Sequence, residues 1–224
     1  MSKTPAQRAR KHGQNAAGAK GAPSSTGAGS RAAGPGGRPG SQAGAERPDG
    51  NPNLIIIAGI GASAFLFGYS SLLVLPQFQQ LSGGLAMPDT LIGGYSTEYL
   101  QQVRSAFGAD GAGQYNFWHK TADTIFPLLF ALSWMLLIGS QLARGPVRWL
   151  CWTPVLLYVV ADLGENLAID AALATDPVGG AGLASFLTVS KSVLFLLSLA
   201  AGAVAVILKR RALKRREPNA APTG

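Results

Sequence analysis

The sequence predicts an all-α membrane protein: a bundle of four transmembrane helices, with one long outer loop containing a short helix and with disordered termini. The chain has a mean hydropathy of +0.21 and only 13% charged residues, although its first fifty residues are polar. Four apolar runs, at about 54–75, 124–143, 147–168 and 183–208, each approach the roughly 20 residues that a helix needs to cross a bilayer. Sixteen of the nineteen Lys and Arg residues fall on one side of the alternating loops, which predicts cytoplasmic N- and C-termini.

The two ends of the chain differ from its apolar middle. Residues 1–53 are rich in Gly, Ala, Ser, Pro and Gln and hold almost no large apolar side chain, so nothing offsets the entropy of ordering them. We predict a disordered basic cytoplasmic tail, which either contacts anionic lipid headgroups or stays solvated and only helps to set the orientation. Residues 209–224 predict a second basic cytoplasmic tail. Because the net charge of +8 follows membrane topology, we predict no nucleic-acid partner.

The first apolar run, 54–75, opens the membrane domain, which we predict to span residues 54–208. Its segment from Gly59 to Ala64 matches the dinucleotide fingerprint G-x-G-x-x-A. No alternating strand and helix pattern follows, and no acidic residue lies at the ribose-binding spacing. Small residues at four-residue spacing favour close helix packing in lipid instead. In the long loop 76–122, Ser96 predicts the N-cap of a short helix that ends at Gly108.

The second run, 124–143, carries Pro127 near its start, and a helical proline clashes with the carbonyl four residues back, here that of Asp123. Either the helix is continuous and Asp123 lies within it, or the helix begins at Asp123 and its side chain is only an N-cap. Tyr115, His119 and Asp123 fall on one helix face at four-residue steps. This spacing predicts that His119 pairs with Asp123.

The third run holds only fifteen residues between Val147 and Ala161, so a spanning helix must continue through Asp162, Glu165 and Asn166. These three positions share one helix face. Ionisable groups inside a span are costly and usually face a protein interior or a wet cavity. Counting about 1.5 Å per residue from the inner flanks places Asp162, Glu165, Lys191, Asp123 and Tyr69 about 21–31 Å up, in one layer of the outer leaflet.

This layer predicts a polar site, in which clustered carboxylates at low dielectric suit general acid or base chemistry. Two alternatives are a structural network, in which Lys191 snorkels or pairs with Asp162 or Glu165, and a hard cation held through oxygens. We predict no cofactor and no metal. The single cysteine, Cys151, excludes CxxC redox chemistry. The acid and base candidates are Asp162, Glu165 and Asp123, and the binding candidates are Asn166, Lys191, His119, Tyr95, Arg104 and Tyr69.

Three short motifs occur in order: Gly94-Tyr95-Ser96-Thr97-Glu98, Asp123-Thr124-Ile125-Phe126-Pro127 and Asp162-Leu163-Gly164-Glu165-Asn166. Over about residues 54–208 the chain resembles an uncharacterised family of small four-helix bacterial membrane proteins with GY[ST]xE, DxxFP and DxxEN motifs. The resemblance implies a shared fold and shared polar positions, and it implies no reaction.

Two hypotheses on function follow for this multi-pass protein of the cell membrane. In the first, the outer-leaflet acidic site binds or modifies a lipid-like molecule, so that membrane lipids are the partners. In the second, the chain is a non-enzymatic assembly or regulatory subunit whose small-residue faces contact another membrane protein or a second copy. Asp162→Asn and Glu165→Gln should abolish function under the first hypothesis, whereas bulky changes at Gly59 or Gly61 should matter more under the second.

Overall fold

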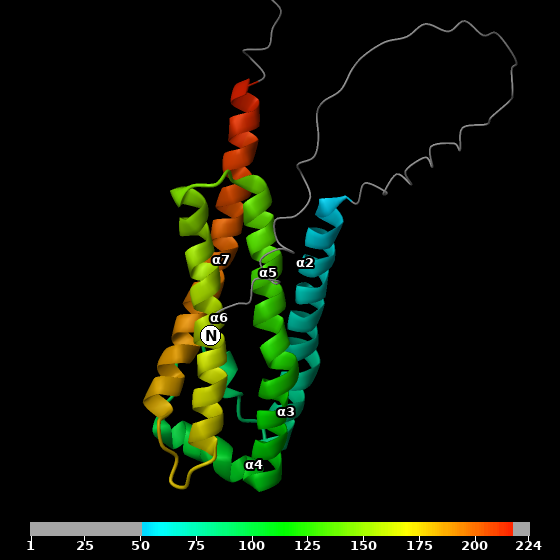
Figure 1. The fold of residues 1–224 in the computed structure, drawn as a ribbon. Helices are drawn as coiled ribbons and strands as arrows, with labels where there is room; N and C mark the ends of the chain where they lie inside the picture. The colour runs from blue at the N-terminus through cyan, green and yellow to red at the C-terminus, as the bar shows by residue number, and fades with distance from the viewer. Residues whose placement is uncertain (1–50, 217–224) are drawn as a thin grey trace, which may run out of the picture. The chain divides into compact units, whose positions relative to one another are not determined.

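A computed structural model describes residues 51–216 of the chain, and it is all-α, with four long helices and no strand in that range. The long helices α2, α5, α6 and α7 run side by side, and α4 lies across one end of them (Figure 1). The predicted disorder of residues 1–50 and 217–224 lies outside the described residues. The elements are α2 (Pro52–Tyr69), the π-helix η1 (Ser70–Val74), α3 (Leu75–Leu81), the 3-10 helix η2 (Pro88–Thr90), α4 (Thr97–Trp118), the π-helix η3 (His119–Asp123), α5 (Thr124–Gln141), α6 (Pro146–Leu173) and α7 (Ala181–Arg216).

Three helical segments are long and apolar enough to cross a membrane: Asn53–Leu81, Thr97–Gln141 and Ala181–Arg215. The third of the four predicted spans, which corresponds to α6, is not among them, although α6 is 28 residues long. This helix alternates apolar stretches with ionisable side chains, namely Arg148, Asp162, Glu165 and Asp170. The structure therefore has three candidate spans, and a fourth span stays a prediction.

Two helix ends differ from the predicted ones. The first helix does not end near Leu75 but passes through the π-helical turn η1 and continues to Leu81. The last helix continues to Arg216 instead of ending near Leu208. Lys, Arg, Ala and Leu are all good helix formers, and no Gly or Pro interrupts residues 209–216. The described part of the predicted C-terminal tail is therefore helical.

The predicted loop helix is confirmed at its start and extended at its end. The side chain of Ser96 accepts a hydrogen bond from the Tyr99 backbone N–H at 3.2 Å, which makes Ser96 the N-cap of α4. Gly108 has φ of 60° and ψ of −168°, a conformation that favours glycine, and it kinks α4 where the sequence predicted a stop. Helix resumes after the kink and runs through η3 into α5 without a break.

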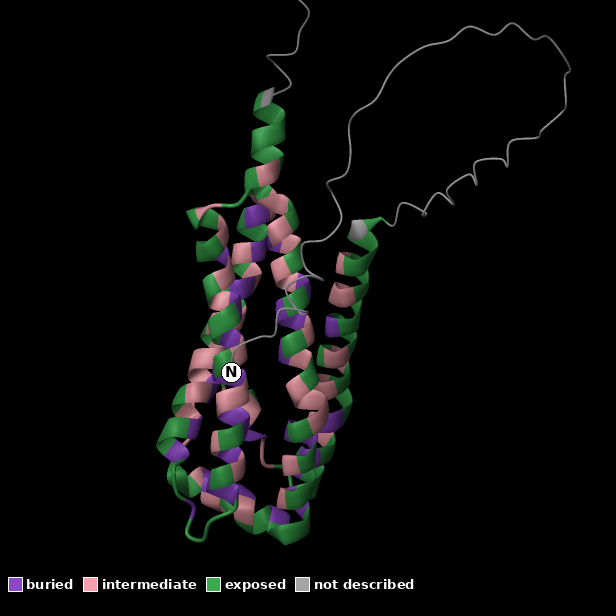
Figure 2. Ribbon diagram, in the orientation of Figure 1, coloured by how far each residue is buried: buried purple, intermediate pink, exposed green. Residues whose placement is uncertain are grey.

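Buried side chains form two clusters, one where α4 meets the ends of the long helices and one between α5, α6 and α7. The first contains the rings of Phe78, Phe107, Tyr115 and Trp118; Phe78 contacts the other three edge-on or tilted, and Tyr115 stacks on Trp118. In Figure 2 the outward faces of the long helices are largely exposed. Apolar side chains dominate these faces, among them Leu150, which is 73% exposed, and such exposure fits contact with lipid.

Three glycines of the long helices differ in what surrounds them. A Cβ atom at Gly59 would collide with the Ser133 hydroxyl, so Gly59 is used for the contact of α2 with α5 inside the chain. A Cβ atom at Gly202 would lie 2.6 Å from Trp134 Nε1, whereas nothing lies within 4 Å of one at Gly61. Of the two glycines that we predicted as partner contacts, only Gly61 faces open space.

Gly202→Ala should lower the free energy of unfolding by about 1–2 kcal/mol, because the added methyl group must displace the Trp134 ring. That ring is held by a hydrogen bond of 2.6 Å from its Nε1 to the Ser198 carbonyl. Titration of the detergent-solubilised protein with sodium dodecyl sulfate measures the change. The matched control is Gly61→Ala, which should be neutral or should stabilise by about 0.5–1 kcal/mol through helix propensity. Equal effects of the two substitutions would contradict the packing described for Gly202.

Candidate functional site

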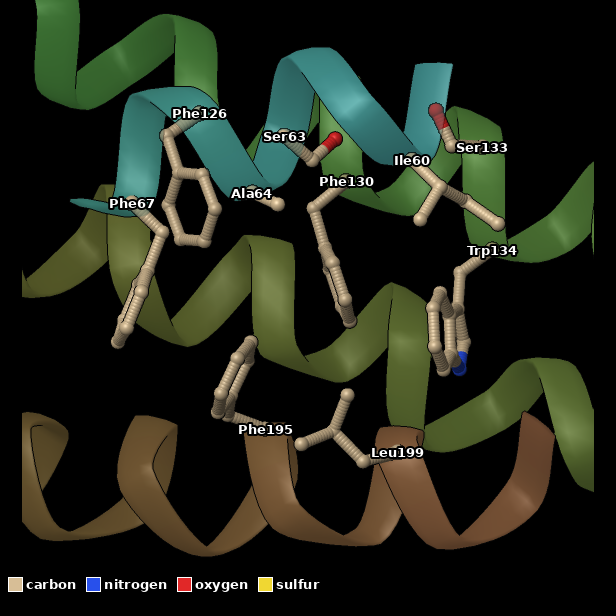
Figure 3. Close-up of a pocket in the computed structure, with 10 residues that line it drawn as sticks. All are labelled: Ile60, Ser63, Ala64, Phe67, Phe126, Phe130, Ser133, Trp134, Phe195 and Leu199. Carbon is tan, nitrogen blue, oxygen red and sulfur yellow. The ribbon is translucent and has the colours of Figure 1, made fainter. Parts of the chain in front are cut away.

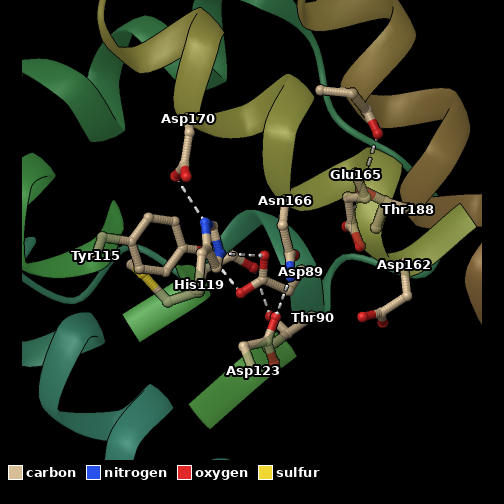
Figure 4. Close-up of polar contacts among 12 residues, drawn as sticks. Asp89, Thr90, Tyr115, His119, Asp123, Asp162, Glu165, Asn166, Asp170 and Thr188 are labelled. Atoms are coloured by element: carbon tan, nitrogen blue, oxygen red, sulfur yellow. Dashed lines mark hydrogen bonds and ion pairs between the residues drawn. The ribbon is translucent and has the colours of Figure 1, made fainter. Parts of the chain in front are cut away.

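His119, in the π-helical turn η3, lies at the centre of a buried polar cluster at the α4 end of the bundle (Figure 4). Its Nδ1 atom lies 2.7 Å from Asp170 Oδ1, and its Nε2 atom lies 3.5 Å from Asp89 Oδ1. The ring is 1% exposed, and its Nδ1 atom is hydrogen-bonded to Asp170, whereas its Nε2 atom faces Asp89 at ion-pair distance without a hydrogen bond. The predicted pair of His119 with Asp123 is wrong, because the ring turns toward α6 and η2 instead of along its own helix.

Asp89 was not among the predicted site residues, and it reaches the cluster from the short helix η2 in the long loop. Its side chain is 6% exposed, and its Oδ2 atom accepts a hydrogen bond of 2.6 Å from the Tyr115 hydroxyl. Burial acts to raise the pKa of Asp89, but the close polar contact with His119 and the positive charge of that ring outweigh it and hold that pKa below its ordinary value of 3.8. Asp89 is therefore an ionised partner of His119.

Asp123 lies inside a continuous helix, which decides between the two predicted alternatives. Its φ of −73° and ψ of −30° are helical, and its side chain makes no capping hydrogen bond. The carboxylate instead accepts a hydrogen bond of 2.8 Å from Asn166 Nδ2 on α6. The Thr124 hydroxyl donates to the His119 carbonyl at 2.6 Å, which satisfies one of the backbone groups that the π-helical turn frees.

Lys191 of α7 pairs with both acidic residues of α6, which is one of the arrangements that the sequence left open. Its Nζ atom lies 3.5 Å from Asp162 Oδ1 and makes a close ion pair with Glu165 Oε2. The other Glu165 oxygen, Oε1, accepts a hydrogen bond of 2.5 Å from the hydroxyl of Thr188, one turn before Lys191 on α7. Glu165 is 0% exposed, so it is fully engaged by these two neighbours. Thr188 is a further member that sequence spacing from Lys191 could have identified.

Tyr95, one of the binding candidates, lies at the edge of the cluster. Its hydroxyl is 3.4 Å from Thr188 Oγ1, and its backbone N–H donates to the Ser185 hydroxyl at 2.9 Å. Burial raises the pKa of the Tyr95 phenol above its ordinary value, so the hydroxyl stays protonated and can donate.

Two other binding candidates lie away from the cluster. Arg104 pairs with Asp176 at 2.8 Å and donates from Nε to the Leu173 carbonyl at 3.1 Å, so it ties α4 to the end of α6. Tyr69 is 43% exposed and stacks on Phe65, with ring centroids 6.4 Å apart. The Tyr69 side chain therefore lies on the outside of the bundle.

A cavity of about 510 Å³ borders the cluster between α2 with η1 on one side and α7 on the other. Among the charged side chains of the cluster, four line this cavity: Asp89, Asp123, Asp162 and Lys191. Glu165 does not line it, because the residue lies behind Lys191. The remaining wall is mostly apolar and includes five aromatic side chains, namely Phe67, Trp118, Phe126, Tyr158 and Phe195.

A second, narrower cavity of about 200 Å³ adjoins the first at Phe67, Phe126 and Phe195 (Figure 3). It follows α2, α5 and α7 away from the polar cluster and ends beside Trp134 and Leu199. Figure 3 shows its side chains converging from these helices, with Ser63 and Ser133 as its hydroxyl-bearing members. Both hydroxyls donate to carbonyls of their own helices, so the cavity wall is apolar in effect.

Asp162 retains a carboxylate oxygen without a partner. Its Oδ1 atom faces Lys191, whereas Oδ2 accepts no hydrogen bond although the residue is 4% exposed. The Oδ1 atom of Asn166, which is 5% exposed, has no partner either. A buried carboxylate oxygen without a donor is costly, and Asp162 is a residue of the wall of the large cavity. Residues 51–216 contain no group of three or more His, Cys, Asp or Glu side chains placed to hold a metal ion.

The fold and the hydropathy of its helices define a helical membrane protein with three candidate transmembrane segments. Comparison of the sequence with protein-family models and with curated proteins, and of the fold with solved structures, finds no match. The site must therefore be interpreted from its own geometry.

Proposed function

We propose that the chain is an integral membrane protein of four spans, with both termini cytoplasmic, that binds an amphiphilic molecule taken from the outer leaflet. The observation that carries this proposal is the change in character between two neighbouring cavities. They share the rings of Phe67, Phe126 and Phe195, which contact one another and would have to move apart for one molecule to occupy both. The large cavity meets the charged side chains of Asp89, Asp123, Asp162 and Lys191, and the small one is apolar. An amphiphile with its polar head in the first and its hydrocarbon tail in the second would match both walls.

The direction of the α6 side chains supports a fourth span. Asp162 and Glu165 are 4% and 0% exposed, so the acidic residues of α6 face the protein interior. Apolar side chains such as Leu157, Val160 and Leu167 are exposed on the same helix. A helix whose charges are paired inside the bundle can cross lipid even though its sequence is less apolar than that of its neighbours.

The packing of the helices supports entry from the side. α2 packs chiefly on α5, and α7 packs on α6 and α5, so the cavities lie where α2 and α7 are not in extensive contact. The rim of the large cavity includes Phe67, Val193 and Leu196, which are 49%, 50% and 66% exposed. An apolar rim of this kind admits a lipid-like molecule without taking its tail through water.

The polar residues then divide into two roles. Asp162 and Asp123 line the cavity and would contact the head of the ligand, and the free Asp162 Oδ2 atom is the acceptor or proton-accepting group of the site. Glu165 would position Lys191, and Asn166 would position Asp123 through its hydrogen bond of 2.8 Å.

Filling the small cavity tests this function. Ala64 of α2 lines that cavity, so Ala64→Trp would place an indole ring where the tail should lie. Ala62 lies two residues away on the exposed face of α2 and lines no cavity that we describe, so Ala62→Trp is the matched control. The measurement is mass spectrometry of the molecules that copurify with the full chain in a mild non-ionic detergent.

We expect one amphiphile class to copurify in near-stoichiometric amount with the wild type and with Ala62→Trp. Its amount should fall by at least about tenfold with Ala64→Trp, which corresponds to a loss of about 1.4 kcal/mol in binding. Retention of the same molecules by Ala64→Trp, or absence of any enriched molecule from all three preparations, would overturn the proposal.

A further inference from the structure

The charges around the large cavity define the chemistry of the ligand head more narrowly. The buried cluster holds more acids than bases. Its carboxylates are Asp89, Asp123, Asp162, Glu165 and Asp170, and its basic groups are His119 and Lys191. A buried surplus of carboxylates is stable only if it takes up protons or gains a cation. We propose that the cavity binds the head of a long-chain amine that carries no phosphate group. This inference rests on the proposed function and names the substrate class of the same site.

The position of the two basic groups argues against a phosphate head. Lys191 is occupied by Asp162 and Glu165, and His119 is occupied by Asp170 and Asp89. Lys191 is also the only basic side chain among those that line the cavity within the described residues. A phosphate in this cavity would therefore face Asp89, Asp123 and Asp162 without a cation of its own, which is unfavourable at low dielectric.

The free acceptor and the aromatic wall favour an ammonium group. Asp162 lines the cavity, its buried Oδ2 atom makes no hydrogen bond, and a primary ammonium supplies up to three N–H donors. Aromatic side chains such as Phe126, Tyr158 and Trp118 line the same space, and aromatic faces attract cations. An alcohol head could donate to Asp162, but only an ammonium head also brings a positive charge to the carboxylates that stay ionised.

The two cavities together also suit a single long chain. They share Phe67, Phe126 and Phe195, and the small cavity ends near Trp134, which lies eight residues along α5 from Phe126. Eight residues of helix correspond to about 12 Å. A dodecyl chain with its head at Asp162 would therefore bring its end toward Trp134.

Bromine at the end of such a chain quenches tryptophan fluorescence by contact, which provides a direct test. The full chain is reconstituted in nanodiscs of neutral lipid and titrated separately with 12-bromododecylamine, 12-bromododecanol and 12-bromododecyl phosphate. We expect saturable quenching by the amine at concentrations at least about tenfold below those at which the alcohol or the phosphate acts. Simple partition of the probe into the bilayer would give quenching that rises without saturation.

Two substitutions connect the binding to the acidic wall. Asp162→Asn should weaken binding of the amine by at least about tenfold and leave the weak response to the alcohol unchanged. Asp110→Asn removes the same charge at an exposed position of α4, so it should have no effect. If Asp162→Asn does not fold, Asp123→Asn serves instead, because an asparagine there can still accept the hydrogen bond from Asn166.

The outcomes separate the two proposals. Absence of saturable quenching by all three probes would overturn the amphiphile site and the amine inference together. Saturable quenching by the alcohol or the phosphate at concentrations equal to or below those for the amine would leave the amphiphile site standing and overturn the inference. Equal binding of the amine to the wild type, Asp162→Asn and Asp123→Asn would also overturn it.

Discussion

Replacement of Lys191 by methionine should lower the free energy of unfolding by about 3–5 kcal/mol, because it leaves two buried carboxylates without a counter-charge. Glu165 is 0% exposed and Asp162 is 4% exposed, so neither group can regain its hydration by a small movement. Methionine keeps most of the length of lysine, which limits the loss of packing and isolates the loss of charge. Titration with sodium dodecyl sulfate in micelles measures the change.

Lys120→Met is the matched control, because Lys120 is exposed on η3 and its replacement should change stability by no more than about 0.5 kcal/mol. The double variant Lys191→Met with Glu165→Gln should recover more than half of the loss, since the buried charge that lost its partner is itself removed. A Lys191→Met protein as stable as the wild type would show that the pair does not support the fold. A double variant less stable than Lys191→Met would show that the two substitutions act independently.

The helices of this chain could be predicted from the local sequence, because each apolar run is long and Gly and Pro residues occur in the loops between the runs. The start of α6 at Pro146 agrees with the predicted run, whereas α5 at Thr124 continues the helix that arrives through α4 and η3. The sequence does not predict where an α-helix changes locally to a π-helix. The residue types of Ser70–Val74 are compatible with both an α-helical and a π-helical turn. The π-helical turn nevertheless changes the face of the helix on which the following residues lie.

The candidate site could be predicted where its partners lie on helices that cross the same layer. The contact of Lys191 with Asp162 and Glu165 could be predicted for two reasons. The number of residues sets how deep a side chain lies along its helix, and a buried charge needs a partner at the same depth. The prediction failed where the partner came from a loop. Asp89 follows Pro88 in a segment without periodicity, so its contact with His119 depends on the path of the whole loop.

The error over His119 has a general cause. Residues four apart on a helix share a face, which made Asp123 the nearest acid in sequence. A buried side chain can instead pair with any acceptor on the elements that pack against it. For His119 this acceptor is Asp170 of α6, whose Oδ1 atom lies 2.7 Å from His119 Nδ1. Arg104 shows the same effect, because its acceptors, Leu173 at the end of α6 and Asp176 just after it, are distant in sequence.

Asp89→Asn should lower the free energy of unfolding at neutral pH by about 2–3 kcal/mol, because it removes the charge that faces His119 in a buried position. An asparagine can still accept the hydrogen bond from the Tyr115 hydroxyl and is close to aspartate in shape. The loss of stability therefore reports mainly the removal of the negative charge. Thermal unfolding in non-ionic detergent, followed by circular dichroism, measures the difference.

The pH dependence of this difference has a defined sign. The pKa of Asp89 in the folded chain lies below its ordinary value of 3.8, so the carboxylate stabilises the fold at every pH above that value. The stabilisation is lost as the pH falls through the lower folded pKa, where the wild-type carboxyl takes up a proton. Asparagine cannot ionise, so the wild type and Asp89→Asn should differ most from about pH 5 to 7 and converge below about pH 4.

Glu98→Gln is the control for the loss of a carboxylate in general. Glu98 is exposed, so this substitution should shift the unfolding temperature by little at neutral pH. A difference between wild type and Asp89→Asn that stays constant down to about pH 3 would contradict an ionised Asp89 with a lowered pKa. A difference that grows toward acid pH would reverse the sign and would mean that Asp89 is protonated in the folded chain. Convergence at low pH would instead establish Asp89, a loop residue, as an ionic partner of the helical site.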